Sequence, residues 1–260
     1  MEAEAEAEAE AEAEAEAEEA APAPAPAPTV LETDATHRVV YRTMVPSDVA
    51  AALPVFAEAF HAGEPVTGCC GCTLRDHLAF TSMFLPRMAE EGNTVVAVDA
   101  ETGTILGGFL CEDYAAADPP GVEAFLAQAD GDWAPVLAMI EELEARLGER
   151  YAIPAAAAER RAGEHFHLWM LGVAPAGRGR GIAKKLTAHA VAWARAKGYA
   201  TAFAECTGSA SAHILQAHAA RVAHVDYGAQ PWEGVRALPA KGHAGMALMV
   251  AELRPAGSVG

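Results

Sequence analysis

The sequence predicts a single mixed α/β domain, in which helices flank a central sheet. Three observations support this fold class. β-Rich runs alternate with helical patterns over residues 35–260. One strong strand, residues 165–173, leads through a glycine-containing turn into a strong amphipathic helix, residues 181–197. A helical insertion, at about residues 113–163, precedes that strand.

Residues 1–34 are expected to form a disordered acidic tail. Glutamate alternates with alanine over residues 2–19, and proline alternates with alanine over residues 20–28. Nearby glutamates repel along any helix, and the Pro-Ala run has no apolar face to bury. The Glu-Ala run holds ten of the 36 acidic residues, so 26 remain outside it against 18 basic residues, a net charge of about −8 instead of −18. We favour a solvated spacer over a partner-binding segment.

Charge and hydropathy limit the possible classes of function. An acidic domain is not suited to coating nucleic acid or anionic lipid. No run of 18 apolar residues predicts a membrane span, and the acidic N-terminal segment resembles neither a signal nor a transit peptide. Five cysteines predict free thiols in the reducing cytoplasm. The cysteines between Cys69 and Cys72 lack the paired spacing of a zinc site, so we expect no metal.

The first half of the domain should contain one strand and two helices. Residues 39–44 form a β-rich run, and Ser47 is the expected N-cap of the helix that follows it. Apolar residues of this helix recur at three-to-four spacing: Val49, Leu53, Phe56 and Phe60. Thr73 and Asp76 resemble a capping box for the second helix, which should end at Gly92.

A β-hairpin and the insertion come next. Residues 94–98 and 105–111 are β-rich runs joined by a glycine-containing turn. Within the insertion, a helix is expected to begin near Asp132 and Pro135 and to end at Gly148. After the strong strand and helix, four shorter elements complete the domain: a strand at 200–205, a helix at 209–220, and strands at 222–227 and 245–253.

The turn before residue 181 carries the clearest functional signal. The first amides of a helix have no intrahelical partners and lie at the positive end of its dipole, so they suit a diphosphate. Gly179 and Gly181 let phosphate oxygens approach the backbone, and Arg178 and Arg180 add positive charge.

Other phosphate-binding motifs fit this turn poorly. A P-loop requires Gly-Lys followed by Ser or Thr, whereas Lys184 and Lys185 are followed by leucine. A dinucleotide fingerprint requires G-x-G-x-x-G, whereas these glycines are Gly177, Gly179 and Gly181. The remaining alternative is a purely structural turn with incidental arginines.

The same segment resembles the cofactor motif of the GCN5-related N-acetyltransferases (GNAT). Arg178, Gly181 and Ala183 match the pattern Q/R-x-x-G-x-G/A, and Val173 and Pro175 precede it as in that family. The resemblance implies a GNAT fold and acetyl-CoA as the cosubstrate. It also implies two cofactor-binding segments: Leu171, Gly172 and Val173 along the pantetheine arm, and Arg178, Gly179, Arg180, Gly181, Ile182, Ala183 and Lys184 around the pyrophosphate.

Within that family, the sequence resembles in particular the arylalkylamine (dopamine-type) N-acetyltransferases and their bacterial relatives. Glu64-Pro65 resembles their acidic E-P-L segment, His167 begins a match to their H-L-x-x-L-x-V strand, and Thr207 begins a match to T-x-x-x-S-x-x-I. One feature departs from the family. Residues 215–221 contain no tyrosine, so the usual general acid has no counterpart there.

Three residues are candidates for the proton transfers of amine acetylation. An alkylammonium has a pKa near ~10, so a base must remove a proton before the amine attacks. Glu64 is the first candidate, because the resemblance places it beside the acceptor; the alternative is an exposed loop carboxylate. His167 is the second, because alternate residues 167–173 of a regular strand share one face; the alternative is a core histidine. Tyr227 is a candidate replacement for the missing acid, or a packed tyrosine.

Phe60, Trp169 and Ser211 are candidates for contact with the acceptor, although such aromatic residues are also common in cores. We therefore predict a cytoplasmic enzyme, monomeric or homodimeric, that transfers an acetyl group from acetyl-CoA to a primary amine. A small arylalkylamine attacking directly in a ternary complex is the favoured version. The alternatives are a peptide or protein N-acetyltransferase with an open groove, and a CoA-binding module without turnover. Nucleic acid, membrane and metal are not expected as partners.

Overall fold

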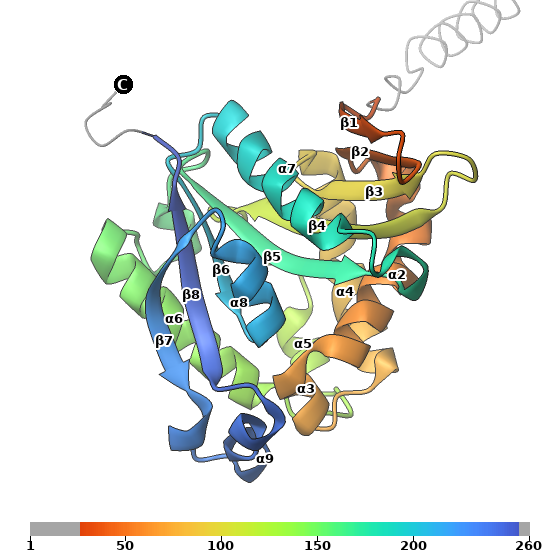
Figure 1. Ribbon diagram of the computed structural model, residues 1–260. Helices are drawn as coiled ribbons and strands as arrows, with labels where there is room; N and C mark the ends of the chain where they lie inside the picture. The colour runs from red at the N-terminus through yellow and green to blue at the C-terminus, as the bar shows by residue number, and fades with distance from the viewer. Residues whose placement is uncertain (1–26, 255–260) are drawn as a thin grey trace, which may run out of the picture.

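The computed structural model describes residues 27–254, and the predicted tail up to residue 26 lies outside them. Within the described range, one eight-stranded sheet has the order β1-β2-β3-β4-β5-β6-β8-β7 (Figure 1). All neighbouring strands are antiparallel except β5 and β6. The strands are β1 (Val30–Asp34), β2 (Val39–Thr43), β3 (Val95–Asp99), β4 (Ile105–Asp113), β5 (His165–Val173), β6 (Thr201–Cys206), β7 (Ala220–Asp226) and β8 (Gly245–Glu252).

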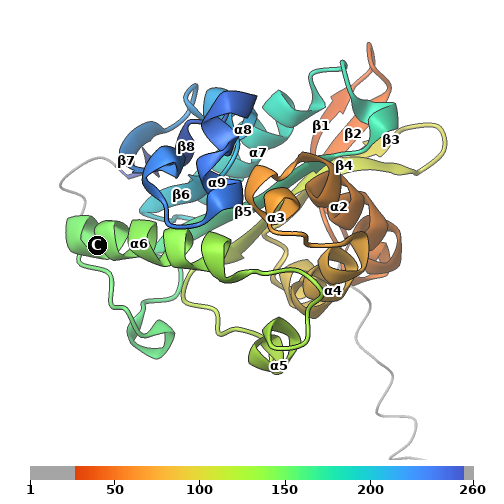
Figure 2. The ribbon, with the colours of Figure 1, turned by 90° about the horizontal axis from the view of Figure 1, so that it is seen from below.

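Helices cover both faces of this sheet, which confirms the predicted fold class (Figures 1 and 2). Helices α7 and α8 pack on one face, and α2, α4 and α6 pack on the other. No helix of the described residues is long and apolar enough to cross a membrane. The helices are α2 (Val49–Gly63), α3 (Pro65–Cys69), α4 (Leu74–Glu91), α5 (Val122–Leu126), α6 (Ala134–Tyr151), α7 (Ile182–Ala196), α8 (Ser209–Leu215) and α9 (Glu233–Arg236).

Strand β1 corrects the predicted limit of the tail. The prediction extended the tail to residue 34, whereas the last five of these residues form an edge strand. Acidic side chains of β1 bind basic side chains of α7. Lys185 Nζ lies 2.9 Å from Asp34 Oδ2 and also contacts Glu32, and His189 Nε2 lies 2.8 Å from the other oxygen of Glu32. These tertiary contacts hold a segment whose composition had suggested disorder.

The helix ends agree with the prediction in one case and differ in two. Thr73 and Asp76 form the predicted capping box at the start of α4. Ser47 is not an N-cap; Asp48 accepts a hydrogen bond from the Val45 amide at 2.9 Å instead. Helix α6 continues through Gly148, because the tertiary packing of its apolar stripe outweighs the low helix propensity of one glycine.

Strand β5 contains a β-bulge that the sequence did not reveal. Met170 lies opposite Leu110, and Leu168 lies opposite Cys111, so Trp169 is an extra residue relative to β4. An extra residue shifts the alternation of side chains by one position and therefore exchanges the two faces of the strand beyond it.

The bulge corrects the prediction that alternate residues from 167 to 173 share one face. Leu171 and Val173 pack with Phe166 in the core beneath α7. Trp169 packs instead in the core formed by α2 and α4, on the opposite face of the sheet. The two ends of β5 thus present their odd-numbered side chains to different sides.

Candidate active site

Strands β5 and β6 diverge near the middle of the sheet. Their parallel pairing covers only residues 165–167 of β5 and 201–203 of β6, whereas β4 stays paired with β5 as far as Val173. The second half of β5 therefore has no strand partner on its β6 side. A parallel pair that separates in this way leaves a gap bordered by unpaired backbone groups.

The backbone of β5 places specific groups at this gap. The Ala174 amide donates to the Leu106 carbonyl at 2.9 Å. In an antiparallel pair, hydrogen-bonded and non-hydrogen-bonded positions alternate. Gly172 therefore faces β4, while the amide and carbonyl groups of Leu171 and Val173 are directed towards the gap.

The turn after β5 exposes a series of unpaired amides. Gly179 and Gly181 have φ angles of 75° and 73°, a left-handed conformation that other residues rarely adopt. Gly181 is the N-cap of α7 and supplies no capping side chain. Within residues 27–254, no acceptor binds the amides of Gly179, Arg180, Gly181, Ile182, Ala183 or Lys184. These six amides lie at the positive end of a 15-residue helix, which makes the turn suited to an anion.

The basic side chains of this turn differ in whether they already bind another group of the protein. Arg178 and Lys184 are exposed and form no ion pair within the described part of the chain. The Arg180 guanidinium donates to the His37 carbonyl in the β1–β2 hairpin. Arg178 and Lys184 are therefore the side chains best placed to add charge to the amide cradle.

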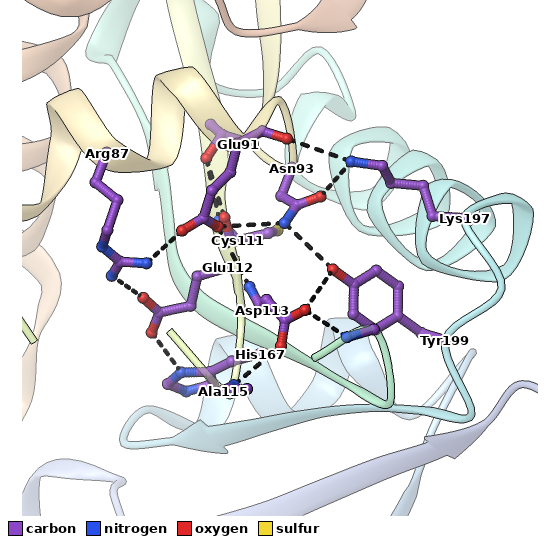
Figure 3. Close-up of polar contacts among 12 residues, drawn as sticks. Arg87, Glu91, Asn93, Cys111, Glu112, Asp113, Ala115, His167, Lys197 and Tyr199 are labelled. Atoms are coloured by element: carbon purple, nitrogen blue, oxygen red, sulfur yellow. Dashed lines mark hydrogen bonds and ion pairs between the residues drawn. The ribbon is translucent and has the colours of Figure 1, made fainter. Parts of the chain in front are cut away.

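His167 lies at the inner end of the gap, held between two carboxylates. Its Nδ1 is 3.0 Å from Glu112 Oε1, and its Nε2 is 2.9 Å from Glu205 Oε2. Phe203 stacks on the imidazole with a centroid distance of 4.8 Å. Glu112 also pairs with Arg87, which binds Glu91 in turn, so a chain of charged groups extends from α4 to β5 (Figure 3).

The two carboxylates determine the protonation state of His167. Burial by itself lowers the imidazole pKa, but the charge of Glu205 and hydrogen bonds to both carboxylates outweigh it and raise the pKa to about 10. Burial raises the Glu112 pKa, but the contacts with His167 and Arg87 outweigh burial and lower it. At neutral pH this histidine is therefore an imidazolium with both nitrogens protonated, which has no lone pair to accept a proton.

Glu144 extends the same cluster from the insertion. It belongs to α6, and burial together with the charge of Glu205 raises its pKa to about 7. Tyr114 lies near it, with a pKa raised mainly by burial and then by the charge of Glu144.

Glu64 is buried at the junction between α2 and α3. Its carboxylate caps α3: Val66 N–H donates to Oε1 at 3.1 Å, and Thr67 N–H donates to Oε2. A carboxylate has about four acceptor positions, so each oxygen retains capacity for another donor. The structure therefore places Glu64 in a capping role that is compatible with a second function.

Two further candidates gather near Glu64. The Tyr227 hydroxyl donates to the Thr207 carbonyl at 2.7 Å, and burial, followed by the charge of Glu64, raises its pKa above the usual value. The Ser211 hydroxyl donates to the Gly208 carbonyl at 2.9 Å, in the first turn of α8. Glu64, Tyr227 and Ser211 thus surround the segment that follows β6.

The aromatic candidates lie on the face opposite α7. Trp169 packs against Phe84 and Phe80, with ring centroids 4.8 and 5.6 Å apart, and Phe80 packs against Trp133 of the insertion at 4.7 Å. Phe60 lies one helical turn before Glu64 and joins the same core as Trp169. The insertion therefore helps to enclose the apolar side of the candidate site.

Glu112 and Glu205 were not predicted from the sequence. Each is a charged residue at or near the end of an apolar strand, Glu112 in ILGGFLCED and Glu205 in TAFAEC. A buried strand rarely carries a carboxylate unless that carboxylate is paired. That exception in the pattern is the signal that would have identified both residues.

The fold and this geometry define a class: a mixed α/β protein whose sheet splits beside a helix start with unpaired amides. The model of the acetyltransferase (GNAT) family matches residues 30–215. The chain belongs to this family. No curated protein sequence matches it.

Solved structures share the fold at low sequence identity. Arylalkylamine N-acetyltransferase 2 from Aedes aegypti has a TM-score of 0.64 at 15% identity, with 83% of this chain and 99% of that chain covered. The polyamine N-acetyltransferase of Drosophila melanogaster, which forms N-acetylagmatine, has a TM-score of 0.60 at 19% identity, covering 83% and 100%. The C-terminal condensation domain of Ebony, in complex with β-alanyl-dopamine, has a TM-score of 0.69 at 13% identity, covering 82% and 98%. At such identities the likeness shows the fold alone.

Proposed function

We propose that this chain transfers an acetyl group from acetyl-CoA to a small primary amine, with arylalkylamines as the favoured acceptors. The observation that carries the proposal is the gap between β5 and β6, which ends at six amides without acceptors among the described residues. Unpaired strand groups suit the amide-containing pantetheine arm, and a helix start suits a diphosphate.

The residues present fit this cosubstrate. The turn from Arg178 to Lys184 would hold the pyrophosphate, and Leu171 to Val173 would pair with the pantetheine arm. Acetyl-CoA supplies an activated acetyl group as a thioester. Among the described residues no cluster of His, Cys, Asp and Glu is arranged to hold a metal ion, and the proposal requires none.

The protein's own groups then handle the protons. Glu64 is our candidate base, acting directly or through water, because its carboxylate is buried yet has acceptor capacity beyond its two capping bonds. His167 supplies a fixed positive charge at the inner end of the gap and does not act as the base. Tyr227 is our candidate proton donor for the leaving thiolate, since burial keeps its hydroxyl protonated; it must exchange its bond to the Thr207 carbonyl to do so.

One assay tests the proposal. The protein is mixed with acetyl-CoA, a thiol reagent and a panel of arylalkylamines, alkylamines and peptides. We expect thiol release with small amines, and binding of CoA that weakens at least about tenfold in an Arg178→Glu/Lys184→Glu variant. Thiol release only with peptides would favour a peptide acceptor, and CoA binding without any release would favour a non-catalytic module.

Glu64→Gln tests the assignment of the base. We expect kcat/KM for the amine to fall by about 10²–10⁴ while the Kd of CoA changes less than about twofold. The melting temperature serves as a control, because the variant also weakens the α3 cap. Unchanged kinetics would remove Glu64 from the mechanism.

A further inference from the structure

Glu205 occupies the edge of the gap between β5 and β6. It lies two residues beyond Phe203, the last β6 residue paired with β5. Its side chain is only 5% exposed, while the residue as a whole is half-buried, so its exposure comes mainly from backbone at the gap. One carboxylate oxygen, Oε2, binds His167, but the other, Oε1, is buried with no hydrogen-bond partner in the structure.

An unpartnered carboxylate oxygen in this position is costly. Burying a polar atom without a partner costs roughly 1–3 kcal/mol, and more when the group is charged. The strand does not require a charged residue at this position, because its neighbours Ala204 and Cys206 are apolar. The unpartnered oxygen therefore indicates that a bound ligand supplies the missing hydrogen-bond donor.

The charges around Glu205 indicate the sign of that donor. Three side chains lie near it: His167 on β5, Tyr114 directly after β4, and Glu144 on α6. Glu112 of β4 binds the other nitrogen of His167. The charged groups of this cluster are the cations Arg87, His167 and Arg160, the anions Glu91, Glu112 and Glu205, and Glu144, whose pKa of about 7 leaves it partly ionised at neutral pH. None of these cations binds Oε1, and ionisation of Glu144 makes the net charge of the cluster negative, so a cationic donor suits this oxygen.

We propose that Oε1 of Glu205 binds the ammonium group of the acceptor amine and so selects positively charged primary amines. This inference rests on the proposed function, which puts the pantetheine arm of acetyl-CoA in the same gap. Glu205 binds the amine as it arrives, and Glu64, which lies beside the segment that follows β6, removes the proton. A primary ammonium has three donors, so one can bind Glu205 while another points to Glu64.

The assignment predicts a discrimination by charge. A cationic amine should bind more tightly than a neutral molecule of the same shape, because only the cation forms a charge-assisted hydrogen bond with the buried, unpartnered Oε1. The matched pairs are 2-phenylethylamine with 2-phenylethanol, and butylamine with butanol. In each pair the alcohol replaces the ammonium and keeps the carbon skeleton.

Calorimetric titration of CoA-saturated protein measures this discrimination without turnover. We expect the wild type to bind the amine of at least one pair at least tenfold more tightly than the alcohol. Glu205→Gln should remove this preference and lower kcat/KM for the amine about 10- to 100-fold, as expected for loss of a hydrogen bond to a charged group. The Kd of CoA should stay within about twofold. Glu205→Asp keeps the charge and should retain part of the preference.

Glu112→Gln is the matched control, because it removes the other carboxylate from the same imidazole. Equal effects of Glu112→Gln and Glu205→Gln would mean that Glu205 acts only through His167, and would overturn the proposal. A charge preference that survives in a folded Glu205→Gln protein, or that is absent from the wild type, would overturn it as well. If Glu205→Gln does not fold, Glu205→Asp decides: a preference that is reduced but still present supports the proposal, and an unchanged preference overturns it. A wild type that binds amines by charge but releases no thiol would contradict the proposed acetyl transfer and leave this assignment standing.

Discussion

His167 should make the stability of this protein depend on pH in an unusual range. Its pKa is about 10 in the folded protein and close to 6.5 in an unfolded chain. Because the folded value is the higher one, the stabilisation is fully present below pH 6.5 and is lost as pH rises towards 10. The test substitution is His167→Gln, which removes the charge from between Glu112 and Glu205.

The magnitude follows from the structure. A pKa raised from 6.5 to about 10 corresponds to at most about 5 kcal/mol at 1.36 kcal/mol per unit. Removing one partner from a buried ion pair typically costs about 3–5 kcal/mol, which agrees. We therefore expect wild type to exceed His167→Gln by about 3–5 kcal/mol in the free energy of unfolding at pH 6.5. The difference should shrink steadily towards pH 10.

Urea denaturation at pH 6.5, 8, 9 and 10 measures this difference, and His165→Gln provides the matched control. His165 lies on the same strand, is also buried, and donates to or accepts from Thr201 Oγ1 at 2.8 Å. Burial lowers the pKa of His165, so its titration influences stability only at acid pH. A constant difference between wild type and His167→Gln across this range would refute the imidazolium assignment, as would an NMR titration of His167 near pH 6.5.

Two further predictions concern the framework of the site. Asp76→Ala should lower the free energy of unfolding by about 2–4 kcal/mol. The Asp76 carboxylate caps α4 and also accepts hydrogen bonds from the Asp130 and Gly131 amides at 2.9 and 3.2 Å. A loss below about 1 kcal/mol in chemical denaturation would contradict this expectation. Gly108→Ala should cost about 1–3 kcal/mol, because its Cβ would lie 2.6 Å from Phe56 Cζ and 2.9 Å from the Val95 carbonyl. Gly63→Ala is the control with open space at the Cβ, and equal melting temperatures for the two variants would rule out the steric argument.

The strands and helices around the turn were predictable because their signals are local. The apolar run at 165–173, the glycines of the turn and the stripe of α7 each occupy a continuous stretch of sequence. The capping box at Thr73 and Asp76 is local for the same reason. Local patterns of this kind depend on backbone geometry alone, and they positioned the amide-lined turn correctly at the start of α7.

The features that were not predicted depend on residues far apart in the sequence. Strand β1 is held by Lys185 and His189, more than 150 positions away. The protonation of His167 depends on Glu112 and Glu205, each on a different strand. No periodicity within β5 contains that information, so the sequence could nominate His167 but could not determine its charge.

The extra residue in β5 also affects how this protein should be aligned with others. Before Trp169, even-numbered residues of the strand point beneath α7; after it, odd-numbered residues do. A gap-free alignment with a protein whose corresponding strand is regular would match inward-facing positions to outward-facing ones over half the strand. Placing a one-residue gap at Trp169 restores the correspondence, and residues transferred across this strand are reliable only when it is included.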